Sequence, residues 1–518
     1  MEASVLVRAE TIWDLVERRA QLSPNEVALL DEGDTRLTFR EFRDRAARVA
    51  AALHADGIGP GSRVAWQLFT KIDTYVLMVA LARLGVVQAP IIPLYREREV
   101  AAAVTAAGAD TLVVPGTWRG TDYATMASSL DLGGRAAPRV LVLENHGPPP
   151  ESEDVRALPP PPADPDEPRW VYFTSGSTGL PKGVMHSDHS LLEAAYGFAL
   201  HGGLGARHGD VGSVPFPVAH IGGVQYLISM LAAGFPVVTI EHFPSQGLEA
   251  LRRHRVTMTG GSTVFYTALL DAQRARPDDP LLPDLRLLKG GGAPSPSWLF
   301  YALRDEMNVT LAHDYGMTEV PMICVAQPDD APQVLAETDG KPIPGLQLRI
   351  MDGAEPVPEG AEGEIEVRGP MVFRGYTDAK ATADAFTADG WFRTGDRGRR
   401  HPTGHVELTG RSKELIIRKG ENIAPLEIEE LLSRHPAVGG AAVIGLPDTE
   451  RGELVCAVIT VAPQSAGAAP PTLAELNRYL TDAGLMVQKL PERLEVLDVL
   501  PVTGLGKVAK AELRRRYA

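Results

Sequence analysis

Hydrophobic and polar positions along the chain follow helical and strand periods in turn. Apolar residues recur every third or fourth position over residues 38–53, which predicts a helix with one buried face. Thr38 and Glu41 form a capping-box pattern at its start, and Gly57 suits its end. A strand-like segment (62–68), an apolar helix ending at Leu84 and a second strand (86–91) follow. This alternation predicts a layered α/β protein.

Two segments interrupt the alternation. Residues 148–168 are too rich in proline for helix or sheet and are predicted to be a surface linker. After residue 412 the pattern restarts with a helix (425–435), strands (440–446 and 454–461), a helix (473–483) and a strand (493–500). We therefore expect a large N-terminal domain of layered α/β subdomains, residues 1–412, and a small mobile α+β domain, residues 413–518.

Composition excludes several classes of protein. The 518 residues carry 51 Lys and Arg against 66 Asp and Glu, a net charge of −15 without a sustained basic run, so nucleic acid is an unsuitable partner. Two cysteines, Cys324 and Cys456, cannot form a disulfide framework or a Cys-rich metal site, and we expect both to be buried thiols. The N-terminus lacks the features of a signal peptide, and the longest apolar segment, residues 74–87, is interrupted by Arg83 and too short for a bilayer. A cytoplasmic protein without membrane insertion is expected.

The strongest chemical signal is YFTSGSTGLPKGV at residues 172–184. Its glycines permit close backbone approach, its hydroxyls and amides can donate to phosphate oxygens, and Lys182 adds positive charge. The lysine follows proline and precedes glycine, so the segment is not a Walker loop. The pattern favours a loop that binds a polyphosphate.

TSGSTGLPKG resembles the phosphate-loop signature of the adenylate-forming superfamily, which includes acyl-CoA synthetases, luciferases and peptide-synthetase adenylation domains. Further matching motifs follow in the family's order and extend the resemblance over nearly the whole chain. They are PFPVAHIGG (215–223), GGGAP (290–294), YGMTE (315–319), GEIEVRGP (363–370), WFRTGD (391–396), GRSKELIIRKGENI (410–423) and PVTGLGK (501–507).

The resemblance implies a nucleotide site for ATP and magnesium. Tyr315 would stack on adenine, Thr318 would bond the α-phosphate, and Glu319 would ligate magnesium, a hard cation that prefers carboxylate oxygen. The residues implied in binding the β- and γ-phosphates are Thr174, Ser175, Gly176, Ser177, Thr178 and Gly179, with Lys182 nearby, and those along adenine are Gly292, Ala293 and Pro294.

The same resemblance assigns roles near the domain boundary. Asp396 would accept both ribose hydroxyls, Arg411 would reach the ribose or phosphate, and Lys507 would bridge the acid carboxylate and the α-phosphate during adenylation. Leu505 departs from the small residue typical of the family beside that lysine. The remaining implied positions are His220 as a gate between acyl pocket and nucleotide, Lys413 as the interdomain hinge, and Gly420 in a loop lining the pantetheine tunnel.

The motif around His220 restricts the class of acid that the protein is expected to bind. SVPFPVAHIGGVQ contains no carboxylate to pair with an α-ammonium group, which argues against an amino acid. Glycines at 222, 223, 290 and 291 are expected to leave room for a bulky acyl group. The resemblance to fatty acid and cyclohexanecarboxylate ligases implies an ATP-dependent acyl-CoA ligase for a hydrophobic, plausibly cyclic, acid, with coenzyme A as the acceptor.

Three alternatives stay open from the sequence. The enzyme makes acyl-AMP and passes it to a carrier protein or a separate enzyme; it is a luciferase-like oxygenase; or it is a non-catalytic adenylate-binding protein. The presence of Lys182, Glu319, Asp396 and Lys507 argues against the last.

Overall fold

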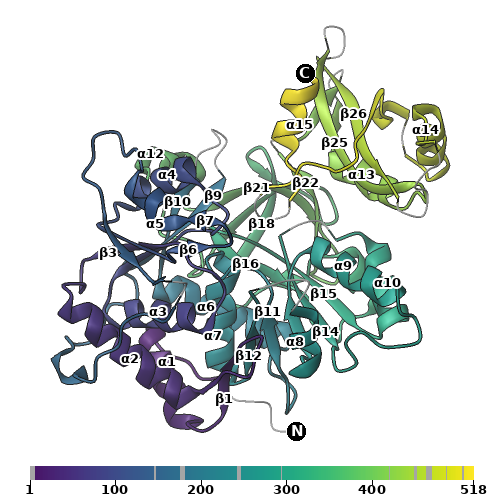
Figure 1. Ribbon diagram of the computed structural model, residues 1–518. Helices are drawn as coiled ribbons and strands as arrows, with labels where there is room; N and C mark the ends of the chain where they lie inside the picture. The colour runs from purple at the N-terminus through teal and green to yellow at the C-terminus, as the bar shows by residue number, and fades with distance from the viewer. Residues whose placement is uncertain are drawn as a thin grey trace.

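The computed structural model describes residues 6–144, 147–175, 181–241, 247–292, 295–412, 414–418, 421–448, 452–462, 469–485, 487–503 and 507–518. Within this part of the chain the architecture is mixed α/β, with a large N-terminal body and a small C-terminal domain (Figure 1). The fold class predicted from the sequence is confirmed. The Thr38–Glu41 capping box is present at the start of α2 (Phe39–Ala55), and both cysteines are buried.

One sheet of the N-terminal body has six strands in the order β10-β9-β4-β3-β5-β8. All neighbours are parallel except β9 and β10, which are antiparallel arms on either side of the glycine-rich segment. Its strands are β3 (Arg63–Trp66), β4 (Val87–Pro90), β5 (Thr111–Val114), β8 (Arg139–Val142), β9 (Pro168–Ser175) and β10 (Pro181–Ser187), accompanied by α3 (Ile72–Arg83), α4 (Glu97–Ala107), α5 (Tyr123–Ser128) and the small hairpin β6 (Thr117–Trp118) and β7 (Thr121–Asp122).

A second sheet has nine strands in the order β17-β16-β15-β14-β13-β11-β12-β1-β2. Its strands are β1 (Val27–Leu30), β2 (Arg36–Thr38), β11 (Gly212–Val214), β12 (Val237–Thr239), β13 (Met258–Gly260), β14 (Leu287–Gly291), β15 (Thr310–Met317), β16 (Val320–Val325) and β17 (Lys341–Pro342). The helices of this part are α1 (Ile12–Leu22), α6 (Asp188–Gly202), α7 (Ile221–Ala233), α8 (Gly247–Arg253), α9 (Thr263–Arg274), α10 (Ser297–Met307) and α11 (Pro332–Glu337). Helix α7 is apolar on nearly every face and almost wholly buried, so it belongs to the interior of the body.

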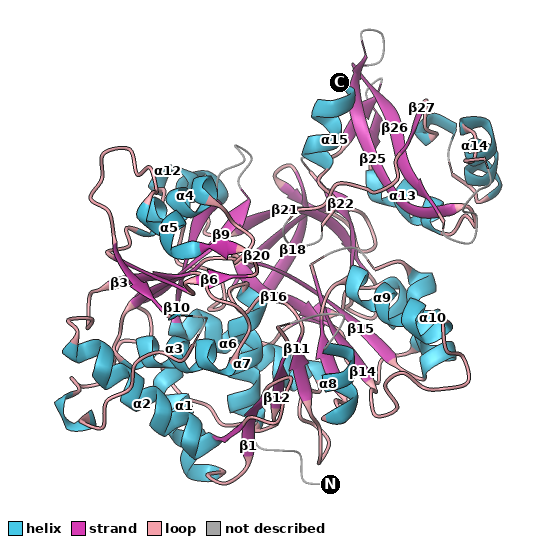
Figure 2. Cartoon of the chain, in the orientation of Figure 1, coloured by secondary structure: helices cyan, strands magenta, loops and turns pink. Residues whose placement is uncertain are grey.

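A third, five-stranded sheet has the order β19-β18-β20-β21-β22 and lies toward the C-terminal domain (Figure 2). Its elements are β18 (Gln347–Asp352), β19 (Glu355–Pro356), β20 (Gly363–Arg368), β21 (Phe392–Arg400), β22 (Val406–Arg411) and helix α12 (Ala379–Ala385). The linker predicted at 148–168 contains a single short 3-10 helix, Val155–Ala157, before β9 begins.

The C-terminal domain has its own hydrophobic clusters, separate from those of the N-terminal body. Its elements are β23 (Ile416–Arg418), β24 (Glu421–Ile423), α13 (Pro425–Ser433), β25 (Val438–Asp448), β26 (Gly452–Val461), α14 (Leu473–Asp482), a 3-10 turn (Val487–Lys489), β27 (Arg493–Val496) and α15 (Lys510–Tyr517). Each element that the sequence predicted in this region is present. Lys413, the predicted hinge, lies outside the described residues, and the boundary between 412 and 413 stays a prediction.

No helix among the described residues is both long enough and apolar enough to cross a membrane.

Candidate active site

The candidate adenine and ribose residues meet where the ends of β15 and β22 lie beside the middle of β21. The Tyr315 hydroxyl donates to one carboxylate oxygen of Asp396 over 2.8 Å, and Arg411 Nε donates to the other over 2.9 Å. Asp396 and Arg411 are directly paired across β21 and β22, so the sheet register sets their separation. Tyr315 and Asp396 are buried, and burial together with the adjacent carboxylate raises the pKa of the Tyr315 phenol. The structure thus joins three sequence-predicted residues into one hydrogen-bonded group.

Lys507 reaches this group from the C-terminal domain. A Cβ atom placed on Gly292 would lie 4.0 Å from Lys507 Cε, so the lysine side chain passes over the end of β14. Desolvation by the surrounding protein lowers the pKa of Lys507, and the positive charge of Arg411 lowers it further, while Asp396 acts in the opposite direction. The ammonium group of Lys507 therefore lies close enough to Arg411 and Asp396 for their charges to shift its pKa.

Thr318 and Glu319 form the turn between β15 and β16 beside the same group. The Glu319 side chain is buried, and burial raises the pKa of its carboxyl. Its Oε1 accepts a hydrogen bond of 2.8 Å from the Tyr376 hydroxyl, and its backbone carbonyl accepts one of 2.9 Å from the Phe373 amide. Tyr376 was missed by sequence reasoning, because nothing local in the segment FRGY points to a carboxylate 57 positions earlier in the chain.

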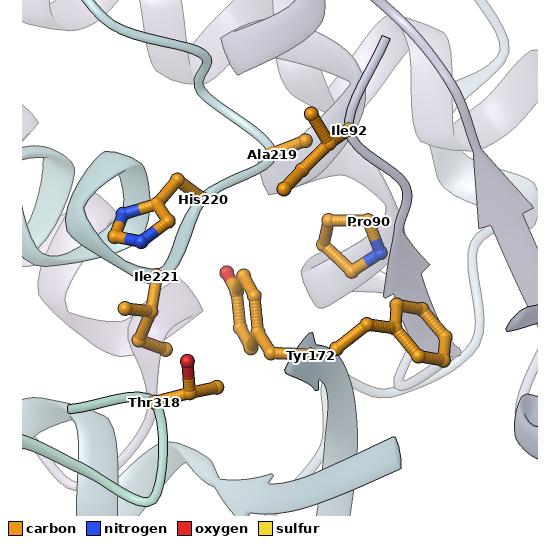
Figure 3. A pocket seen from close by; sticks show the side chains of 8 residues that line it. Pro90, Ile92, Tyr172, Ala219, His220, Ile221 and Thr318 are labelled. Atoms are coloured by element: carbon orange, nitrogen blue, oxygen red, sulfur yellow. The ribbon is translucent and has the colours of Figure 1, made fainter. Parts of the chain in front are cut away.

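His220 caps the start of α7. Its Nδ1 accepts the Gly222 amide over 3.2 Å, and its ring meets Phe216 edge to face at 6.4 Å. Burial, together with the charge of Lys507, lowers the pKa of His220 to about 4, so the imidazole is neutral at pH 7. Figure 3 shows His220, Thr318 and Tyr172 around one small pocket. The side chains of Pro90, Ile92, Phe173, Ala219 and Ile221 complete its lining.

The phosphate-loop arms are described, but the loop is not. Thr174 on β9 pairs with Lys182 on β10, and Lys182 is exposed. The remaining predicted contacts lie outside the described residues: Gly176, Ser177, Thr178, Gly179, Ala293, Pro294, Gly420 and the side chain of Ser175.

The structure changes the interpretation of the four glycines that were expected to leave room for an acyl group. A Cβ on Gly223 would lie 2.1 Å from the Val218 carbonyl oxygen, and one on Gly291 would lie 1.8 Å from the Asp314 carbonyl oxygen. Gly290 has φ +147° and approaches the backbone of residue 261. A Cβ on Gly222 would lie 3.1 Å from the Phe216 ring. Gly223, Gly290 and Gly291 are therefore required by close approach of the backbone, so these three do not report the size of the acyl group. Only Gly222 faces side chains alone.

Comparisons with known proteins agree with this arrangement. The AMP-binding enzyme family matches residues 16–377, and the AMP-binding enzyme C-terminal domain matches residues 427–507. The chain is 33% identical to the salicyl-AMP ligase / salicyl-S-ArCP synthetase of Mycobacterium tuberculosis (strain ATCC 25618 / H37Rv), over 98% of this chain and 90% of the relative. It is also 33% identical to the 2-hydroxy-7-methoxy-5-methyl-1-naphthoate–CoA ligase of Streptomyces carzinostaticus, over 96% and 91% of the two chains.

A solved structure shows the same fold over the full length. ATP-bound MatB from Rhodopseudomonas palustris superposes with a TM-score of 0.85 at 28% identity, covering 98% of this chain and 99% of that one. Both domains and their order are thereby accounted for. The chain belongs to the AMP-binding enzyme family and is an adenylate-forming acid ligase.

Proposed function

We propose that this protein joins a hydrophobic, non-amino carboxylic acid to coenzyme A in two steps. The carboxylate attacks the α-phosphorus of ATP, forming a carboxyl–phosphate bond and releasing pyrophosphate. The thiol of coenzyme A then attacks the acyl carbon of the acyl-AMP, forming the thioester and releasing AMP. The second step follows rotation of the C-terminal domain about the predicted hinge at Lys413.

The observation that carries the proposal is the convergence of Lys507 with the Tyr315–Asp396–Arg411 group. Attack of a carboxylate on a phosphate brings two anions together, and a preorganised ammonium group lowers the barrier by placing positive charge there. Lys507 belongs to the C-terminal domain, and its side chain brings a positive charge close to Gly292 and Asp396. In this position Lys507 would contact the carboxylate of the acid and the α-phosphate of ATP, and Thr318 would bond the α-phosphate.

Glu319 fits the proposed role in holding magnesium. It is buried, its carboxylate is fixed by Tyr376 on one oxygen, and burial already disfavours an unpaired negative charge there. Among the described residues no group of three or more His, Cys, Asp or Glu side chains is placed to hold a metal. A single carboxylate suits magnesium, which takes most of its ligands from phosphate and water. When bound, the cation would neutralise charge on the phosphates.

The residues around His220 support a hydrophobic acid without an amino group. Residues 213–225 include no carboxylate to pair with an ammonium group, and the described neighbours of His220 include the apolar Phe216 and Ile221. The naphthoate–CoA ligase relative supports both a cyclic hydrophobic acid and coenzyme A as the acceptor.

A second candidate is transfer of the acyl group to a carrier protein. It is favoured by the similarity to the salicyl-AMP ligase / salicyl-S-ArCP synthetase. Both candidates share the adenylation step and differ only in the thiol that accepts the acyl group.

The test is a panel of carboxylic acids with ATP and magnesium, in which pyrophosphate release is measured first and thioester formation second. We expect pyrophosphate release with hydrophobic aliphatic, cyclic or aromatic acids, and an acyl-CoA product when coenzyme A is added. Response to α-amino acids alone would overturn the substrate class. Formation of acyl-AMP that coenzyme A does not consume, but a carrier-protein thiol does, would select the second candidate.

A further inference from the structure

His186 is a buried polar residue that the proposed chemistry does not use. It lies on β10, the strand that begins at the phosphate-loop segment, and its side chain is fully buried. Its Nε2 lies 2.7 Å from the Thr318 carbonyl oxygen, and its Nδ1 lies 3.0 Å from Ser190 Oγ. A carbonyl oxygen can only accept, so Nε2 carries the hydrogen. The contact therefore joins the six-stranded sheet to the turn of the nine-stranded sheet that carries Thr318 and Glu319.

The histidine is held in this orientation from its other side. Burial lowers the pKa of His186 to about 4, so the ring is neutral, and its Nδ1 faces Ser190 Oγ, whose single hydrogen is shared with the Ser187 carbonyl oxygen at 3.0 Å. Ser190 is itself fixed at the start of α6, where its backbone amide donates to Ser187 Oγ and its Oγ accepts from the Ser187 amide. The imidazole is thus a rigid link of defined length between β10 and Thr318.

A second connection runs in parallel. The segment 373–377 lies along β10, with the Arg374 amide donating to the Met185 carbonyl over 2.7 Å and the Met185 amide donating to the Gly375 carbonyl over 2.9 Å. The same segment supplies the Phe373 and Tyr376 contacts to Glu319. Hydrogen bonds therefore connect both residues of the turn to β10. Thr318 is connected through His186, and Glu319 is connected through the segment 373–377.

We propose that His186 is a positioning residue that sets the Thr318–Glu319 turn at the correct distance from the phosphate-loop arms β9 and β10. The inference rests on the proposed function, in which the loop binds the β- and γ-phosphates while Thr318 and Glu319 act on the α-phosphate and magnesium. One triphosphate has to contact both parts at once, so their separation governs catalysis. A displacement of about 1 Å at such a site costs on the order of a hundredfold in rate.

The chain allows a matched set of variants. In His186→Gln the amide nitrogen occupies the place of Nε2 and retains the donation to the Thr318 carbonyl, whereas in His186→Asn the amide oxygen occupies the place of Nδ1 and retains only the contact with Ser190. His186→Leu removes both. His189→Leu is the control, since His189 lies three residues further on and pairs with Asp166 on the surface, 2.9 Å away.

The measurement is kcat/KM for magnesium-ATP in adenylation, alongside single-turnover conversion of supplied acyl-AMP to thioester, with binding of magnesium-ATP followed by calorimetry. We expect adenylation to fall about 10- to 100-fold in His186→Asn and His186→Leu, with magnesium-ATP affinity reduced in parallel. We expect His186→Gln and His189→Leu to stay within about threefold of wild type. Thioester formation from supplied acyl-AMP needs neither the triphosphate nor magnesium, and it should change less than about threefold in all four.

Equal adenylation by His186→Asn and His186→Gln would overturn the proposal, as would an equal loss in both half-reactions, which marks a general loss of structure. If His186→Leu does not fold, the comparison of the Gln and Asn variants decides the question alone. Failure of the proposed function is distinguishable, because the wild-type protein would then release no pyrophosphate with any acid.

Discussion

A buried ion pair behind the nucleotide site offers a test of the energetics of this fold. Lys289 Nζ lies 2.6 Å from Asp314 Oδ1 and donates to the Ala326 carbonyl over 2.7 Å, and both charged side chains are at most 2% exposed. Lys289 directly precedes Gly290 on β14, and Asp314 directly precedes Tyr315 on the neighbouring β15. Burial lowers the pKa of Lys289 and raises that of Asp314, so desolvation outweighs their mutual attraction.

Lys289→Met would leave the Asp314 carboxylate buried with the Ala326 amide, at 3.0 Å, as its one remaining donor within the part of the chain that the structure describes. Removing one partner of a fully buried pair costs about 3–5 kcal/mol, roughly a thousandfold in the unfolding equilibrium. The double variant Lys289→Met with Asp314→Leu removes both charges and should be within about 1–2 kcal/mol of wild type, or more stable. Removal of one charge is thus expected to destabilise the fold strongly, whereas replacement of both charged side chains by apolar ones is expected to change its stability little.

The loss of stability in Lys289→Met should change with pH in a definite direction. The orphaned Asp314 carboxyl in Lys289→Met has a folded-state pKa above its unfolded value, so it is protonated in both states at low pH. As pH rises, the unfolded chain loses this proton first, and stability falls between the two pKa values. The deficit of Lys289→Met should therefore be smaller at pH 5 than at pH 8.

Urea denaturation followed by tryptophan fluorescence measures these differences. The control is Lys380→Met on the exposed face of α12, expected to change stability by less than about 0.5 kcal/mol. A Lys289→Met variant as stable as this control, or a double variant as unstable as Lys289→Met, would refute the reasoning.

Three further predictions concern the proposed site. Lys507→Ala should slow acyl-AMP formation about 10²- to 10³-fold and largely spare thioester formation from supplied acyl-AMP, in single-turnover kinetics of each half-reaction; equal losses would argue against separate poses of the C-terminal domain. Glu319→Gln should slow adenylation on the order of 10²-fold, most strongly at limiting magnesium, while circular dichroism stays unchanged; an unaffected rate would remove Glu319 from the metal site. Asp396→Asn should raise KM for ATP about tenfold or more, because a charged acceptor for the ribose is lost, and should leave KM for the acid unchanged.

The sequence by itself determined the fold class and most of the elements, because these depend on short-range patterns. The capping box at Thr38 and Glu41, the buried helix before Leu84 and the order of elements after Lys413 are all set by the period of apolar side chains and by local hydrogen bonds. Motif resemblance also named Tyr315, Asp396, Arg411 and Lys507, which the structure brings together; their catalytic roles stay predictions.

Only the tertiary structure decided which residues surround that group. His186 contacts Thr318 across 132 positions because two separate sheets meet there, and Tyr376, on the segment between β20 and α12, contacts Glu319 across 57. The glycines at 223 and 291 look in sequence like space for a substrate, yet each faces a backbone carbonyl, that of Val218 in the loop before α7 and that of Asp314 on the neighbouring strand β15. Periodicity specifies which face of an element is buried, and it does not specify what that face meets, since the partner is chosen by the packing of the whole chain.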